Sequence, residues 1–185
     1  MKIGSLIKDA LILTVITLVL GLALSGAKVA TQPLIDKATA ESTMKAYSKV
    51  CPGYATSEDI TKSVEGINSN FKAKLTSVLE CKDANGNKIG YIVEGTGKGF
   101  GGDLNLVVGF DTNGKTIGVQ YKNTPSETPG LGMKTTESKF LDTWANKTTD
   151  DVDKVDTISG ATISSSAFKD IVSMACFYAN IVANK

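Results

Sequence analysis

The sequence predicts an α+β protein, with one N-terminal transmembrane helix followed by a domain in which helices flank an antiparallel sheet. Three features of the 185-residue chain lead to this prediction. An uncharged stretch lies near the N-terminus, and alternating apolar residues surround two Asn-Gly turns in the middle of the chain. Apolar residues at helical spacing then run to the C-terminus.

The uncharged stretch is long enough for a membrane anchor. The 18 residues from Ala10 to Ala27 carry no charge, and a helix of about 20 apolar residues spans the hydrocarbon core of a bilayer. A cleaved signal peptide is the alternative, because Lys2 and Lys8 precede the apolar run and the small residues Leu24-Ser25-Gly26-Ala27 end it. The length of the run favours a retained, single-pass anchor.

Lysines do not decide the orientation of this span, because Lys2 and Lys8 precede it while Lys28 and Lys37 follow it. The very short N-terminal tail and the signal-like layout favour a C-terminal domain on the extracytoplasmic side of the cytoplasmic (inner) membrane. The predicted organisation is an anchor over residues 1–30, a membrane-proximal helix over residues 31–50 and a folded domain over residues 51–185.

Four strands are predicted around two turns, Asn85-Gly86 and Asn113-Gly114, which are typical of hairpins. Apolar alternation predicts one antiparallel sheet, made of two hairpins, with one buried face. The predicted strands are Leu75–Cys81, Lys88–Glu94, Leu104–Phe110 and Ile117–Tyr121.

Helices are predicted before and after the sheet, from apolar residues at helical spacing. They are Thr31–Lys49, which Cys51-Pro52-Gly53 ends, then Glu137–Asn146 and finally Ile163–Asn184. Phe140, Leu141 and Trp144 lie on one side of the middle helix and are interpreted as core residues. Val155–Ile158 can form a short strand, and residues 56–72 are too mixed to assign.

The composition argues against several classes of function. The formal net charge is +1, with 20 Lys and Arg residues spread among 19 acidic residues, so no basic patch predicts a nucleic-acid partner. The chain has no histidine, which removes the commonest metal ligand and the commonest general acid or base. Asp150–Asp153 lacks the pattern of a calcium loop and is interpreted as a solvated loop.

The three cysteines, Cys51, Cys81 and Cys176, contain no C-x-x-C pair, so the sequence predicts neither a zinc site nor an iron–sulfur site. A disulfide between Cys51 and Cys81 stays open, because sequence separation alone does not decide it.

The segment Gly97-Lys98-Gly99-Phe100-Gly101-Gly102 matches G-x-G-x-x-G but does not predict a dinucleotide site. That fingerprint needs a helix directly after the last glycine, whereas Leu104–Phe110 is predicted to be a strand. Two interpretations stay open: a flexible connection between hairpins, or a place where the backbone approaches a flat ligand closely.

The segment Asp156–Thr162, which reads D-T-I-S-G-A-T, is the strongest chemical signal. Thr162 is predicted at the start of the C-terminal helix, where free backbone N–H groups and the helix dipole attract a phosphate. An ordinary N-cap is the alternative for the short Ser-Gly-Ala-Thr stretch. The full pattern D-x-x-[ST]-G-A-[ST] arises by chance at only roughly a few per million positions. The neighbours that offer room or hydroxyl groups are Ser159, Gly160, Ala161, Ser164 and Ser165.

A second segment, Glu127–Gly132, reads E-T-P-G-L-G, which alone would predict only a Pro-Gly turn. Both segments behind one N-terminal span resemble the FMN-binding subunits of bacterial ion-pumping respiratory complexes. The resemblance is strongest to the G subunits of the Rnf-type ferredoxin:NAD⁺ oxidoreductases. The C subunits of the sodium-pumping NADH:quinone oxidoreductases are the alternative, and they are usually longer.

The resemblance implies a role for each residue of the two segments. Thr162 would carry FMN through a phosphoester made by a separate flavin transferase, with Asp156 as a recognition residue for that enzyme. The phosphate and ribityl chain would lie against Ser159, Gly160 and Ala161. The isoalloxazine ring would lie against the loop of Glu127, Thr128, Pro129, Gly130, Leu131 and Gly132. Members of this family often carry a histidine just before E-T-P-G-L-G, where this chain has Pro125 and Ser126.

The resemblance also implies an electron relay without a catalytic site of its own. Electrons would arrive from a membrane subunit that holds an iron–sulfur centre and would leave to a second flavin subunit. A single uncharged helix offers no path for ions, so ion coupling would belong to partner subunits. Two other classes stay open: a stand-alone, membrane-tethered extracellular FMN module, and a non-redox binding module with an accidental motif.

Overall fold

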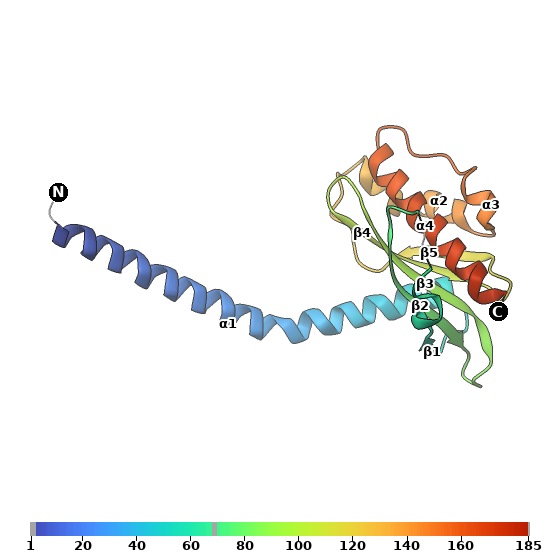
Figure 1. Ribbon diagram of the computed structural model, residues 1–185, viewed down its shortest axis with the longest axis horizontal. Helices are drawn as coiled ribbons and strands as arrows, with labels where there is room; N and C mark the ends of the chain where they lie inside the picture. Colours follow the sequence, from blue (N-terminus) through green and yellow to red (C-terminus); the bar gives the residue numbers. More distant parts are fainter. Residues whose placement is uncertain (1–2, 68–69, 185) are drawn as a thin grey trace. The chain divides into compact units, whose positions relative to one another are not determined.

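The computed structural model describes residues 3–67 and 70–184 (Figure 1). Lys2 of the signal-like start and residues 68–69 of the unassigned segment lie outside the described residues. By its contacts the chain divides into a first unit, Met1–Glu41, and a second unit, Ser42–Lys185. The predicted boundaries at residues 30 and 50 refer to the membrane, and they stay predictions.

Helix α1 (Ile3–Val50) joins the predicted anchor and the predicted membrane-proximal helix without a break, and it continues through Pro33. From Lys8 onward it is long and apolar enough to cross a membrane, as judged by length and composition. Its apolar side chains are exposed; Leu11 and Leu24 are 63% and 72% accessible. Such a surface is stable in lipid, where the helix satisfies its own backbone hydrogen bonds.

The sheet has five antiparallel strands in sequence order, so each strand pairs with the next one along the chain. They are β1 (Thr56–Asp59), β2 (Lys74–Lys82), β3 (Lys88–Lys98), β4 (Asp103–Phe110) and β5 (Thr116–Tyr121). The four predicted strands are confirmed, as are both Asn-Gly turns, in which Gly86 and Gly114 adopt φ values of +82° and +76°. Strand β1 lies in the segment that the sequence left unassigned. All four of its side chains are polar and exposed, so no apolar alternation indicated a strand there.

The expectation of one buried face was wrong, because both faces of the central strands are covered. On one face, α4 (Thr162–Ala183) packs on β3 and β4 and closes the main core (Figure 1). On the other face, the end of α1 packs through Tyr47 and Val50 against Ile92 and Val107. Strand β3 is accordingly buried at six successive positions, a pattern that two-sided burial produces.

Short helices connect β5 to α4. The predicted helix 137–146 is present as α2 (Ser138–Leu141) followed by the 3-10 turn η3 (Asp142–Trp144). Its side chains Phe140 and Trp144 stack edge to face in the core with ring centroids 5.6 Å apart, as predicted. Two further short 3-10 helices are η1 (Thr61–Val64) and η2 (Gly132–Thr136).

Two expectations between Thr148 and Ile158 were wrong. Asp150–Asp153 is not only loop, because α3 (Thr149–Val152) forms there, and Thr148 and Asp151 complete a capping box at its start. Val155–Ile158 is not a strand but an irregular segment. The ammonium group of Lys169 donates hydrogen bonds to the carbonyls of Asp153 and Val155 at 2.6 and 3.1 Å, which replaces pairing with a neighbouring strand.

Cys51 and Cys81 belong to the smaller core beside α1 and are buried free thiols. A hydrogen bond between the two thiols, together with burial, raises the pKa of Cys81. Cys176 is buried in the main core. The disulfide that the sequence left open is therefore not formed in this structure.

Candidate functional site

The signature segment ends at the first turn of α4. Thr162 is the first residue of the helix, as predicted, and its side chain is exposed. Ala161 occupies the N-cap position, and no side chain among the described residues caps this helix end. Gly160 adopts φ +79°, a left-handed conformation that favours glycine, and this turn brings the chain into the helix. The first backbone N–H groups of α4 are therefore open to an external acceptor.

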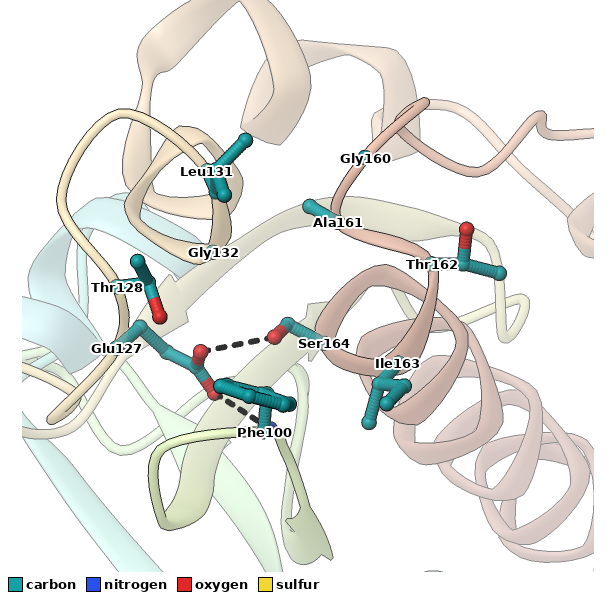
Figure 2. Close-up of a pocket in the computed structure, with 10 residues that line it drawn as sticks. All are labelled: Phe100, Glu127, Thr128, Leu131, Gly132, Gly160, Ala161, Thr162, Ile163 and Ser164. Carbon is teal, nitrogen blue, oxygen red and sulfur yellow. Dashed lines mark hydrogen bonds between the residues drawn. The ribbon is translucent and has the colours of Figure 1, made fainter.

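A cavity of about 300 Å³ lies beside this helix start. Three segments form its wall: the glycine-rich connection between β3 and β4, the E-T-P-G-L-G loop, and residues 160–164 (Figure 2). They come together from positions more than twenty residues apart in the sequence. The lining residues are Phe100, Glu127, Thr128, Leu131, Gly132, Gly160, Ala161, Thr162, Ile163 and Ser164.

The rim of the cavity is apolar although it faces solvent. Phe100, Leu131 and Ile163 are 69%, 44% and 57% exposed, and they are the three exposed large apolar side chains that the described residues contain outside α1. All three line this one cavity. A concentration of exposed apolar side chains on an otherwise polar domain is typical of a binding surface.

A buried carboxylate closes the floor. Glu127 is 8% exposed, and its Oε1 accepts hydrogen bonds from the backbone amides of Phe100 at 3.0 Å and Gly101 at 3.3 Å. Its Oε2 accepts a hydrogen bond from the hydroxyl of Ser164 at 2.8 Å (Figure 2). Glu127 therefore joins all three segments of the wall, and both of its carboxylate oxygens are occupied within the protein.

A second layer of hydrogen bonds supports the E-T-P-G-L-G loop. The hydroxyl groups of Tyr121 and Thr135 lie 2.8 Å apart, and Thr135 donates to the carbonyl of Gly132 at 2.7 Å. Burial raises the pKa of Tyr121 to about 12, so this phenol stays neutral at physiological pH. The start of η2 is therefore fixed from β5.

The predicted site residues divide between the cavity wall and its surroundings. Eight of them line the cavity: Glu127, Thr128, Leu131, Gly132, Gly160, Ala161, Thr162 and Ser164. Pro129, Gly130, Ser159 and Asp156 are exposed and are not part of the cavity wall. Ser165 is buried; its hydroxyl donates to the carbonyl of Ala161 at 2.9 Å and accepts from the amide of Ile158 at 3.0 Å, which fixes the signature segment onto α4.

Two lining residues, Phe100 and Ile163, were not predicted as site residues. Phe100 lies within the glycine-rich segment, so one of the two open interpretations of that segment, a close approach to a flat ligand, could have included it. Ile163 follows Thr162 directly, and an exposed isoleucine in the first turn of a helix is the signal that sequence reasoning passed over.

Thr162 and Ile163 also line a second cavity, of about 530 Å³, whose wall includes Lys72 and Lys98. In Figure 2 the side chain of Thr162 points away from Phe100 and Glu127. The same wall includes the Asp170 carboxylate, which accepts a hydrogen bond from the amide of Ala73 at 2.6 Å and offsets part of the positive charge of the two lysines.

This arrangement fits FMN, which combines an anionic phosphate with a flat, largely apolar ring. An uncapped helix start is a ready anion site. An apolar cavity with a few polar groups and close backbone approach suits the ring. For a covalent link, Thr162 supplies an exposed hydroxyl group at the boundary of both cavities.

Comparison with known proteins identifies a matching domain family and similar proteins. The sequence profile of the FMN-binding domain family matches residues 99–176. The chain is similar to the G subunit of an ion-translocating oxidoreductase complex from Methanosarcina acetivorans, with 31% identity over 154 residues, which is 80% of each chain. It is also similar to the solved structure of NqrC from Shewanella oneidensis, with 22% identity and a TM-score of 0.45. That match covers 70% of this chain and 66% of NqrC, just under two thirds of its length.

The 99–176 match spans all three segments of the cavity wall, from Phe100 to Ser164. The chain therefore belongs to the family of G subunits of ion-translocating oxidoreductase complexes, and residues 99–176 are an FMN-binding domain.

Proposed function

We propose that this chain is the electron-relay subunit of a membrane-bound ion-translocating ferredoxin:NAD oxidoreductase complex, and that it carries FMN through a phosphoester to Thr162. One observation carries the proposal. Among the described residues outside α1, all the exposed large apolar side chains surround one cavity, and this cavity lies next to an uncapped helix that begins at Thr162. Membership of the G-subunit family supports it.

When bound, FMN supplies the ability to accept and release electrons one at a time. The chain's residues hold and shield it. The first backbone N–H groups of α4 donate hydrogen bonds to the phosphate, and Phe100, Leu131 and Ile163 exclude water from the ring. Burial against apolar side chains disfavours charged forms of a group, so this wall also influences the reduction potential. No histidine is needed for any of these roles.

Attachment of FMN requires that a flavin transferase reaches the signature segment. Asp156, Ser159 and Gly160 are exposed in the segment that leads to Thr162, so another protein can contact them in the folded domain. We propose Asp156 as a recognition residue for that transferase, and Ser159 and Gly160 as the backbone against which the phosphate end lies.

We place the folded domain on the extracytoplasmic side of the cytoplasmic membrane, with the apolar part of α1 as a single span. A covalent tether suits that location, because a dissociated cofactor would be lost by dilution. The proposed electron donor is a membrane subunit with an iron–sulfur centre, and the proposed acceptor is a second flavin subunit. Co-purification of both from a native membrane separates this proposal from a stand-alone FMN module.

The decisive experiment uses the full-length chain produced together with a flavin transferase. Denaturing gels viewed under ultraviolet light should show a fluorescent band for the wild type and a dark band for Thr162→Val. Thr157→Val is the matched control, because Thr157 is an exposed threonine at a variable position of the same signature segment. The band of the Thr157→Val variant should stay fluorescent. A dark wild-type band in the presence of an active transferase would remove the covalent proposal.

A further inference from the structure

The Glu127 carboxylate connects three segments that are far apart in the sequence. Its three hydrogen-bond donors are the amides of Phe100 and Gly101 and the hydroxyl of Ser164, at 3.0, 3.3 and 2.8 Å. They lie 26 to 37 residues away from Glu127 in the sequence. We call this arrangement the clasp. Charge-assisted hydrogen bonds of this kind are stronger than neutral ones, particularly where the carboxylate is shielded from water.

Glycines allow the segments to approach the clasp. A Cβ at Gly99 would collide with Oε1 of Glu127, and a Cβ at Gly132 would collide with Oε2. A Cβ at Gly101 would collide with the backbone carbonyl oxygen of Ser126. The glycine-rich connection between β3 and β4 is therefore required for close approach to the Glu127 backbone and carboxylate.

The clasp holds the backbone of Phe100 but leaves its ring free. The Phe100 amide is bonded to Glu127, whereas the side chain is 69% exposed at the edge of the cavity. Figure 2 shows the ring between Glu127 and Ile163, on the cavity side of its loop. An aromatic ring on a fixed backbone at the edge of a cavity is arranged to stack on a flat ligand.

We propose that Phe100 is a lid that stacks on the flavin ring, and that Glu127 is a positioning residue that holds this lid through the clasp. The inference rests on the proposed function, because it concerns the same cavity. It gives Glu127 a different role from the direct ring contact that the family resemblance implied.

Glutamine can replace glutamate in the clasp but alanine cannot. The amide oxygen of glutamine accepts from both backbone N–H groups, and its NH₂ group can donate to the hydroxyl of Ser164, which also accepts. Glu127→Gln therefore keeps the clasp and removes only the charge. Glu127→Ala leaves two backbone amides and one hydroxyl without their acceptor.

The first test uses full-length protein produced without flavin transferase, so it does not depend on FMN. Hydrogen–deuterium exchange at the amides of Phe100 and Gly101 should be faster by roughly tenfold in Glu127→Ala, which corresponds to the loss of one hydrogen bond. Exchange in Glu127→Gln should match the wild type. The control is Glu94→Ala, which removes a buried carboxylate on β3, outside the cavity wall. This variant lowers the global stability, but under native conditions it should leave exchange by local opening at these two amides unchanged.

The second test uses protein loaded with FMN and measures quenching of flavin fluorescence by iodide. Glu127→Ala and Phe100→Ala should both make the flavin several times more accessible, whereas Glu127→Gln and Phe100→Tyr should behave like the wild type. Phe100 lies on an exposed loop, so Phe100→Ala remains informative even where Glu127→Ala does not fold.

Three outcomes would overturn the proposal: unchanged exchange in Glu127→Ala, equal effects of the Gln and Ala variants, or unchanged quenching in Phe100→Ala. A failure to load FMN at Thr162 would instead defeat the proposed function, while the exchange experiment would still decide whether the clasp exists.

Discussion

Two buried carboxylates on different sides of the domain are stabilised in different ways. Glu94, on β3, is 4% exposed and forms an ion pair with Lys122 at 2.9 Å. It also accepts hydrogen bonds from Tyr47 at 2.6 Å and Ser77 at 3.0 Å. Glu127 is similarly buried, but its partners are two backbone amides and a hydroxyl, and the ion pairs found in the described part of the chain do not include it.

The difference follows from what each carboxylate joins. Glu94 connects β3 and the end of β5 to Tyr47 near the end of α1, a junction that must stay fixed if the sheet is to be held to the helix. A cation beside it compensates the cost of burying its charge. Glu127 joins loops around a cavity, where dipoles stabilise the charge without adding a bulky cation to the wall. The surroundings of Glu94 therefore serve stability, whereas the surroundings of Glu127 serve the shape of the cavity.

The largest effect on stability should come from removing the Glu94 carboxylate. Glu94→Ala leaves Lys122 partly buried without its partner, and we expect the free energy of unfolding to fall by about 3 kcal/mol. Urea denaturation of the full-length protein measures this value. The iodide accessibility of bound flavin should not change, because the cavity wall is untouched. A clear rise in the iodide accessibility of the flavin in Glu94→Ala would contradict the assignment of separate roles to Glu94 and Glu127.

Glycine substitutions sharpen the comparison, because the same change can be made on both sides. A Cβ at Gly109 would collide with the backbone of Val50 at the end of α1. Gly109→Ala should therefore lower the free energy of unfolding by about 2 kcal/mol through overpacking. Gly101→Ala should cost less stability, since its loop is exposed and can shift, but it should raise iodide accessibility of the flavin. Equal stability losses in the two variants would argue against our interpretation.

A smaller effect is expected from one hydrogen bond at the fixed junction. Tyr47→Phe removes the hydroxyl that donates to Glu94 while keeping the ring in the core beside α1. Lys122 and Ser77 still satisfy the carboxylate, so the expected loss is about 1 kcal/mol, measured by urea denaturation. The double variant Tyr47→Phe, Ser77→Ala should lose more than the sum of the two single variants, because in each single variant the remaining donor still satisfies the carboxylate.

The smallest effect concerns a partly exposed carboxylate, Asp151, which serves as the reference for the two buried ones. The ammonium group of Lys154 and the hydroxyl of Thr148 lower the pKa of Asp151 to about 2. A lowered pKa stabilises the fold above the ordinary aspartate pKa of about 4, and this stabilisation disappears as the pH falls through about 2. The difference in thermal midpoint between wild type and Asp151→Asn should thus be small and constant near neutral pH, and absent at about pH 2. A difference that grows with acidity would have the wrong sign.

Local residue patterns were enough to predict the features that depend on neighbouring residues. The long apolar helix α1, the turns at Gly86 and Gly114, and the helix start at Thr162 all follow from local composition or backbone preference. The signature segment could be recognised from the sequence for the same reason: its glycine, its small residue and its threonine lie within one turn.

Features that depend on contacts between distant residues could be recognised only in the folded domain. Strand β1 has no apolar alternation, and it forms because β2 offers an edge to pair with. The second buried face exists because the end of α1 packs on Ile92 and Val107. Phe100 reaches the cavity, and Glu127 becomes a clasp rather than a free polar group, because three distant loops meet at one point. Sequence periodicity reports a residue's own element, whereas burial and partners depend on what packs against that element.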